Sequence, residues 1–245
     1  MKKISELNLE KYKLVIFDWD GTLVDSLDFY DIWDQLFVEK FYGVNWPLEN
    51  FCKLSLEMKN VQTMHSESTY FRYLDKKFGD GKTPMKTIWE QIYKLAPEIQ
   101  SQVNYKDTVY EVLKKFKKNS QLKLALSTNS GLKDIKFYSS DSSKTANKIN
   151  PLDFFDKVIT LDDIEHPKPH PESYQRIIGH FLVDSSEVLV FEDSLSGVQS
   201  ARQAGADIVV VYDKRSEKDR HKMKKISNFY IKDWDEILKL LKINK

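Results

Sequence analysis

The sequence is poor in cysteine and has no long apolar run near its start. Cys52 is the only cysteine among the 245 residues, so an intrachain disulfide is impossible and a reducing compartment fits. The first apolar run is Leu14 to Phe17, which is far too short for a signal-peptide core or a membrane span. We therefore expect a cytoplasmic protein without a membrane partner.

Neither sign of charge dominates the chain. There are 38 Lys and Arg residues against 37 Asp and Glu residues, so no global charge draws the protein toward nucleic acid. The densest basic segment, residues 214–225, is interrupted by Glu217 and Asp219 and is expected to be a solvated surface. With 41% hydrophobic and 31% charged residues, the composition is typical of a globular protein.

Short apolar runs alternate with helical patterns over most of the chain. The apolar runs are residues 14–17, 122–126, 158–159, 188–191 and 208–212. Helical spacing covers residues 108–118, the segment after Pro171, residues 195–204 and residues 233–241. Short, continuous apolar runs favour strands buried on both faces. The pattern therefore predicts an α/β fold with a doubly wound, Rossmann-like parallel sheet.

The stretch between the first two predicted strands differs from the rest. Residues 27–102 contain helical stripes and no convincing strand, which predicts an inserted all-helical cap domain. The α/β core is then predicted to comprise residues 1–26 and 103–245. Its segment 138–150 is rich in Ser, Lys and Asn, so we expect a mobile surface loop there.

Polar residues stand where the predicted strands end, at the edge where open parallel sheets form active sites. The candidate site residues are Asp18 and Asp20 after the first strand, Thr128 and Asn129 after the second, Lys168 between two prolines, and Glu192 and Asp193 after the fourth. Any one of these could be a helix cap, a turn or a surface residue. Four such elements in order make coincidence a poor explanation.

The chemistry of these residues favours phosphoryl transfer. A cluster of Asp and Glu side chains is costly unless a cation neutralises it. Ligands that are all oxygen point to a hard cation, Mg²⁺ first. A lysine and hydroxyl donors suit a phosphoryl group, and a carboxylate is a known nucleophile toward phosphorus.

These motifs resemble the haloacid dehalogenase-like hydrolase superfamily, in particular its phosphatase branch with a helical cap after the first motif. The matching segments are residues 18–26, Thr128 with Asn129, residues 168–174, and residues 190–194 with Gly197 and Ala201. The resemblance covers residues 10–27 and 103–245, and the helical insert matches only in its position. It implies hydrolysis of a small phosphate monoester through an aspartyl-phosphate intermediate.

Roles for individual residues follow from the resemblance. It implies that Asp18 is the nucleophile and a metal ligand, and that Asp20 is the general acid and base and offers its backbone carbonyl to the metal. Asp193 would be a metal ligand, with Glu192 a direct or indirect partner. The transferring phosphoryl group would be bound by Thr128, Asn129 and Lys168.

Some alternatives stay open. Asp20 argues against dehalogenation, because the dehalogenases lack an acid at that place. No histidine lies near Tyr30, where the family's mutases carry one, yet a phosphomutase with the same aspartyl-phosphate chemistry is an alternative. A catalytically silent binding protein is a further one. The expected partner is a small phosphorylated metabolite, for a monomer or a homodimer, and the sequence does not identify the ester.

Overall fold

The structure is a computed structural model and describes residues 2–58, 67–145 and 148–243. The chain divides into two compact units, one of residues 1–25 with 104–245 and one of residues 26–103. None of the described helices is both long and apolar enough to cross a membrane.

The larger unit contains a sheet of six parallel strands. They are β1 (Leu14–Phe17), β2 (Lys123–Ser127), β3 (Lys157–Ile159), β4 (Val188–Glu192), β5 (Asp207–Val211) and β6 (Phe229–Ile231), in the order β3-β2-β1-β4-β5-β6. Phe17 pairs with both Leu126 and Phe191, so β1, β2 and β4 end level with one another. The predicted doubly wound parallel sheet is confirmed. The last strand, β6, was not predicted.

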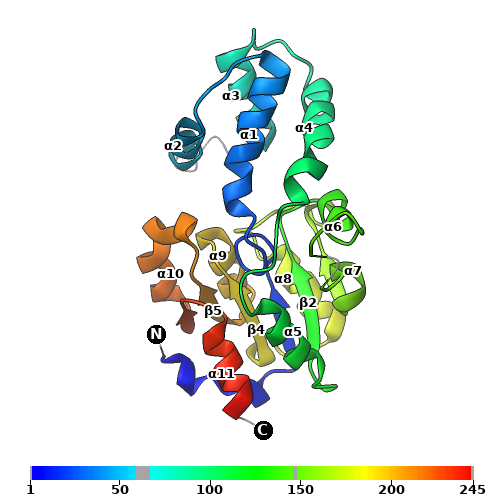
Figure 1. Ribbon diagram of the computed structural model, residues 1–245. Coiled ribbons are helices and arrows are strands. Elements are labelled where there is room, and N and C mark those ends of the chain that lie inside the picture. Colours follow the sequence, from blue (N-terminus) through cyan, green and yellow to red (C-terminus); the bar gives the residue numbers. More distant parts are fainter. Residues whose placement is uncertain (1, 59–66, 146–147, 244–245) are drawn as a thin grey trace. The chain divides into compact units, whose positions relative to one another are not determined.

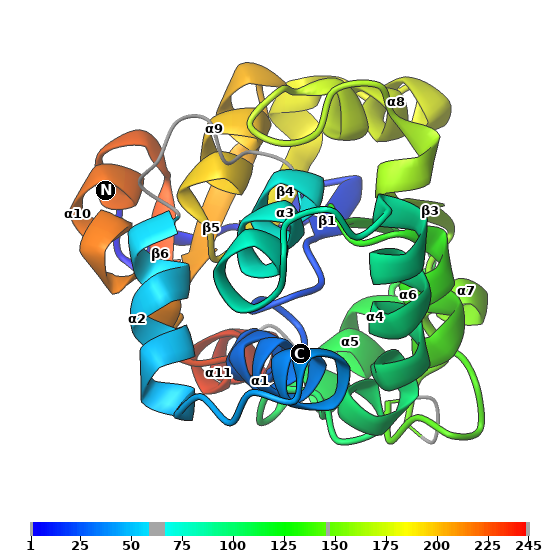
Figure 2. The same cartoon turned by 90° about the horizontal axis from the view of Figure 1, so that it is seen from above.

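Helices cover both faces of this sheet (Figures 1 and 2). Helices α8 (Glu172–Phe181) and α9 (Leu195–Gln203) lie on one face, and α5 (Val109–Lys117) and α11 (Asp235–Ile243) lie on the other. The remaining helices of this unit are α6 (Leu132–Tyr138), α7 (Pro151–Phe154) and α10 (Arg220–Ile226), with short 3₁₀ helices at Ile4–Glu6, Leu9–Lys11, Leu161–Asp163, Ser185–Glu187 and Lys214–Asp219. Because helices cover both faces, β1 and β4 are buried along their whole length.

The described residues between 138 and 150 match the predicted surface loop only in part. Ser143, Thr145 and Ile149 are buried, and the Thr145 hydroxyl donates to the backbone oxygen of Tyr138 at 2.9 Å. The Tyr105 hydroxyl donates to the backbone oxygen of Ile149 at 3.0 Å. The described residues 141–145 and 148–150 form no regular helix or strand, and Asp141, Ser142, Lys144 and Lys148 are exposed. The prediction of a surface loop is therefore wrong only for the buried residues. Their polar side chains bond inside the segment, which a polar composition alone does not reveal.

The described residues of the smaller unit form helices and the segments that connect them, and no strand. It contains α1 (Leu27–Tyr42), α2 (Leu48–Met58), α3 (Glu67–Phe78) and α4 (Met85–Gln100). Its core packs around Phe37, Phe51 and Leu74, with Trp46 and Trp89 against them. Buried Asp75 accepts hydrogen bonds from the Tyr42 hydroxyl, from Arg72 and from the backbone N–H of Thr83. This carboxylate ties α1, α3 and the segment before α4 together.

Candidate active site

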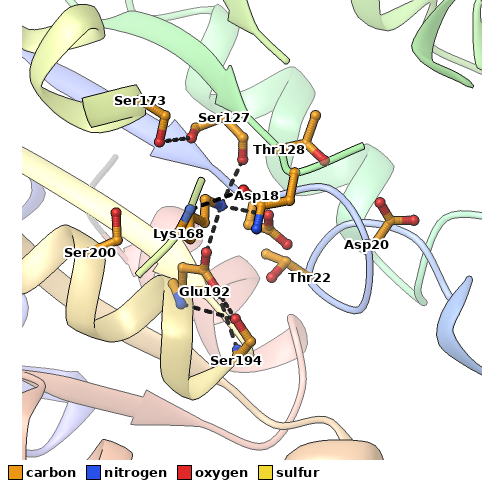
Figure 3. A network of polar contacts seen from close by, with 12 residues as sticks. Asp18, Asp20, Thr22, Ser127, Thr128, Lys168, Ser173, Glu192, Ser194 and Ser200 are labelled. Atoms are coloured by element: carbon orange, nitrogen blue, oxygen red, sulfur yellow. Dashed lines mark hydrogen bonds and ion pairs between the residues drawn. The ribbon is translucent and has the colours of Figure 1, made fainter. Parts of the chain in front are cut away.

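The candidate site forms where the order of the strands reverses, between β1 and β4, the usual ligand position of such sheets. Asp18 directly follows β1, and its backbone N–H donates to the backbone oxygen of Phe191 in β4 at 3.0 Å. Glu192 is the last residue of β4, and Asp193 follows it. The register of the two central strands therefore brings the three carboxylates together. Figure 3 shows two of them, Asp18 and Glu192.

Lys168 joins the ends of β1, β2 and β4. Its ammonium group donates to Asp18 Oδ1 at 2.7 Å, to Glu192 Oε1 at 2.7 Å and to the backbone oxygen of Ser127 at 2.9 Å (Figure 3). Only 3% of this side chain is exposed. Since all three of its N–H groups have an acceptor in this arrangement, the position of the ammonium group is fixed.

Glu192 is held by hydrogen bonds on both oxygens. Oε1 accepts from Lys168 and from the Tyr174 hydroxyl at 2.8 Å, and Oε2 accepts from the backbone N–H of Asp193 and from the N–H and hydroxyl of Ser194. The carboxylate also lies so close to Gly197 that a Cβ there would come within 1.8 Å of Oε1. Glycine at position 197 thus makes room for Glu192 at the start of α9.

Asp193 is oriented by residues of two other segments. The Thr22 hydroxyl donates to Asp193 Oδ1 at 2.9 Å, and the backbone oxygen of Thr22 accepts from Trp234 Nε1 at 3.1 Å. Trp234 is buried against Phe17 and Phe191. The turn after β1 is therefore hydrogen-bonded to Asp193 on one side and to Trp234, at the start of α11, on the other.

The other predicted site residues lie after β1 and β2. The Thr128 hydroxyl oxygen accepts the backbone N–H of Ser130 at 2.9 Å, and the exposed Asn129 accepts the backbone N–H of Lys168 at 3.3 Å. Half-buried Asp20 accepts a 2.5 Å hydrogen bond from the Ser130 hydroxyl. Lys168 thus contacts both Asp18 and Glu192 directly, whereas Asp20 is linked to the turn after β2.

Burial and charge shift the titration of the central groups. Burial raises the pKa of Asp18 above its ordinary value, against the lowering effect of Lys168, and burial with the nearby charges of Asp18 and Glu192 raises the pKa of Asp193. Burial would lower the pKa of Lys168, but the carboxylates of Asp18 and Glu192 raise it well above the ordinary value. Lys168 therefore stays protonated, and the simultaneous ionisation of Asp18 and Asp193 is unfavourable.

This donor set fits a divalent metal ion. One oxygen each of Asp18, Glu192 and Asp193 lies within 4.8 Å of the others, and all three residues are buried. Three carboxylates face a single lysine, so the ionised cluster carries two uncompensated negative charges. A hard divalent cation matches both the charge and the oxygen ligands.

Comparison with known proteins agrees with this geometry. The sequence signature of the haloacid dehalogenase-like hydrolases matches residues 12–205. The chain belongs to this family. The match confirms the resemblance found in the sequence and identifies the protein as a hydrolase.

Several curated proteins and solved structures are similar to this chain along most of its length. The pyrophosphatase PpaX of Bacillus mycoides is 26% identical over 82% of this chain and 84% of its own length. A phosphorylated carbohydrates phosphatase of Thermotoga maritima is 24% identical over 79% and 82%. The crystal structure of CbbY from Rhodobacter sphaeroides in complex with phosphate matches with a TM-score of 0.68 and 17% identity over 91% of this chain and 95% of that chain, which shows the fold alone.

Two residues that contact the site had no predicted role. Tyr174 belongs to the apolar stripe of α8, but its buried hydroxyl donates to Glu192. Trp234 belongs to the apolar stripe near α11, but its indole N–H holds the turn after β1. A buried Tyr hydroxyl or Trp N–H needs an acceptor, and this requirement is the signal in the sequence that could have pointed to both.

Proposed function

We propose that the protein is a Mg²⁺-dependent phosphatase that hydrolyses a small phosphate monoester, with Asp18 as its nucleophile. The observation that carries the proposal is the position of Asp18, held by Lys168 beside Asp193 at the end of β1. Family membership and the phosphatase names of two relatives support the same reaction class. The helical unit of residues 26–103 is proposed to be the cap that selects the substrate.

The first step is attack by the Asp18 carboxylate. One of its oxygens bonds to phosphorus while the bond from phosphorus to the ester oxygen breaks, which leaves a phosphoryl group on Asp18. Lys168 would turn the N–H that now bonds Asp18 Oδ1 toward a phosphoryl oxygen, while Glu192 and the backbone oxygen of Ser127 keep the other two. The Thr128 oxygen already accepts the N–H of Ser130, so its own hydrogen is available for a phosphoryl oxygen. Asn129, next to it, adds an amide donor.

The proposed role of Asp20 is proton transfer in both steps. The departing ester oxygen takes a proton from the Asp20 carboxyl group, and Asp20 then takes a proton from the water that attacks the phosphoryl group on Asp18. The products are the alcohol and inorganic phosphate, and both aspartates return to their starting forms. The hydrogen bond from Ser130 supports this role because it orients the Asp20 carboxyl group.

A bound Mg²⁺ supplies positive charge that stabilises the transferring phosphoryl oxygens. Asp18, Asp193 and the backbone carbonyl of Asp20 are its proposed ligands. Glu192 accepts five hydrogen bonds, so its proposed contribution is to hold Lys168 and the turn after β4. Repulsion between the aspartates in the absence of a cation supports this assignment.

A phosphate-release assay over a panel of phosphate monoesters, with Mg²⁺ or with a chelator, tests the proposal. Asp18→Asn should reduce turnover by at least about a thousandfold, as removal of a catalytic group does. Asp153→Asn, which changes an exposed carboxylate on α7, is the matched control and should retain normal turnover. Near-normal release by Asp18→Asn, or by the wild type in chelator, would refute the mechanism.

The same assay separates the phosphatase from the phosphomutase. A phosphatase releases one phosphate for each ester consumed, whereas a mutase returns the phosphoryl group to an isomeric product and needs a bisphosphate activator. Asp20→Asn adds a test of the proton transfers. In the first turnover it should slow the release of the alcohol from alkyl phosphates far more than the release of the phenol from an activated aryl phosphate, whose leaving oxygen needs no proton. Steady release of phosphate should fall with both, because Asp20 also takes the proton of the attacking water. Equal slowing of alcohol and phenol release in the first turnover would remove Asp20 from the role of general acid.

A further inference from the structure

Two histidines and a glutamate gather on the surface of the larger unit, in the segment that leads into α8. The His166 and His170 rings lie 4.6 Å apart between centroids, and His166 Nδ1 lies 3.1 Å from Glu172 Oε2. One nitrogen of each ring and one oxygen of Glu172 fall within 4.8 Å of one another. None of these three side chains has a role in the proposed hydrolysis.

The Glu172 carboxylate is held in place by its neighbours. It accepts the backbone N–H of Glu165 at 3.1 Å and that of His166 at 2.9 Å, and Arg176 pairs with Oε1 at 2.6 Å. Slight burial would raise its pKa, but these hydrogen bonds lower the pKa of Glu172 to about 2. The carboxylate is therefore ionised at neutral pH, with Oε2 turned toward His166.

We propose that His166, His170 and Glu172 form a surface site that binds a divalent transition-metal ion of the type of Zn²⁺. Two imidazoles and one carboxylate are the kind of ligand set that Zn²⁺ accepts, with water completing its four-coordinate shell. With bonds of about 2.1 Å, the ligand atoms of a tetrahedral Zn²⁺ lie roughly 3.4 Å apart. The 3.1 Å between His166 Nδ1 and Glu172 Oε2 is close to that separation.

The backbone between the ligands is stiff. Pro167, Pro169 and Pro171 alternate with His166, Lys168 and His170, and proline fixes the φ angle at each of its positions. A stiff loop loses less conformational entropy when an ion binds, which favours binding. The ion would connect the two ends of the segment that carries Lys168, so its binding should stabilise that segment.

This site differs from the carboxylate cluster in its chemistry. Asp18, Glu192 and Asp193 offer oxygen alone and are buried, which suits Mg²⁺, whereas the surface site offers nitrogen ligands and exposed rings. Saturating Mg²⁺ should therefore occupy the cluster of carboxylates and leave the histidine site open to Zn²⁺. The two sites can be tested independently, and failure of one leaves the other intact.

The experiment is a calorimetric titration of the full chain with Zn²⁺ in saturating Mg²⁺. We expect one equivalent to bind, and His166→Gln or His170→Gln to weaken it by at least about tenfold, since loss of even an outer-shell partner costs about 10–100-fold. His180→Gln and His221→Gln are matched controls, because both rings are exposed and lie outside the site. They should bind Zn²⁺ as the wild type does.

A second measurement ties the binding to these side chains. In ¹H–¹⁵N spectra of the histidine rings, Zn²⁺ should shift the signals of His166 and His170 and leave those of His180 and His221 unchanged. The metal-free variants should unfold at the wild-type temperature, which excludes misfolding as the cause of lost binding. The proposal is overturned if His166→Gln and His170→Gln bind Zn²⁺ normally, or if Asp193→Asn alone abolishes binding.

Discussion

The metal-free protein should become less stable as the pH rises from about 4.5 to 7.5. Burial raises the pKa of Asp18 from 3.8 to about 7, and the pKa of Asp193 is raised as well. Between the unfolded and folded pKa values the folded state binds more protons than the unfolded state, so the free energy of unfolding falls as pH rises. Binding of Mg²⁺, as proposed, should remove this penalty because the ion would stabilise both ionised carboxylates.

The expected size of the effect follows from the shift. A change from 3.8 to about 7 corresponds to on the order of 4 kcal/mol for Asp18, and Asp193 acts in the same direction. Carboxylates with a lowered pKa, such as Asp75 and Asp156, act in the opposite direction. They lose their contribution only when the pH falls below about 4, at the usual carboxyl pKa, so the two effects occupy separate pH windows.

Urea unfolding in chelator at several pH values measures this dependence, and a second series with Mg²⁺ measures its reversal. Asp193→Asn removes one of the coupled carboxylates and should flatten the slope in chelator. Asp153→Asn changes an exposed carboxylate and should keep the wild-type slope. A stability in chelator that stays constant or rises between pH 4.5 and 7.5 would refute the electrostatic account of the cluster.

Two further substitutions test a hydrogen bond of the site and the backbone at the start of α5. Tyr174→Phe removes the hydroxyl that bonds Glu192 and should lower the free energy of unfolding by about 1.5–3 kcal/mol, the range for hydrogen bonds to charged groups, in urea titrations. An unchanged value would mean that the other four hydrogen bonds hold the carboxylate without the Tyr174 hydroxyl. Thr108 lies at φ 62°, and its buried hydroxyl has no partner among the described residues, so Thr108→Gly should stabilise the protein by about 1 kcal/mol. Calorimetry should then show a melting temperature higher by about 2–4 °C. A lower melting temperature would contradict the inference that the backbone of Thr108 is strained.

Much of the fold could be predicted because its strands are buried on both faces. The apolar runs that became β1 and β4 have no polar residue inside them, and the acidic residues that follow them mark the carboxyl edge of the sheet. The strand β6 could not be found in this way. Its three residues, Phe229–Ile231, are too few for a periodic pattern to distinguish a strand from a loop.

The hydrogen bonds within the site were less predictable than its residues. Sequence position alone indicated that Asp18 and Lys168 meet at the carboxyl edge of the sheet. Asp18 follows a predicted strand, and Lys168 precedes a predicted helix, at that edge. It did not indicate that Tyr174 and Trp234 send polar groups from apolar stripes toward Glu192 and Thr22. These contacts depend on the packing of α8 and α11 against the sheet. The assignment of a helical cap to residues 27–102 stays a prediction, as do the catalytic roles.

Glu192 and Asp193 are adjacent acids in the sequence, but their surroundings separate their roles. Glu192 accepts five hydrogen bonds, including that of Lys168, whereas Asp193 is oriented by Thr22 after the strand has ended. An oxygen that already accepts several hydrogen bonds is a poor ligand for an additional cation.

We therefore expect Asp193→Asn to raise the Mg²⁺ concentration needed for half-maximal activity much more than Glu192→Gln does. Glu192→Gln should instead lower stability, because Lys168 loses one of its two buried carboxylate partners and breaking a buried ion pair costs about 3–5 kcal/mol. Mg²⁺ titrations of activity and urea unfolding of both variants separate the two effects. If Glu192→Gln weakened Mg²⁺ as strongly as Asp193→Asn and left stability unchanged, Glu192 would be a direct ligand, and its hydrogen bonds would have to rearrange when the ion binds.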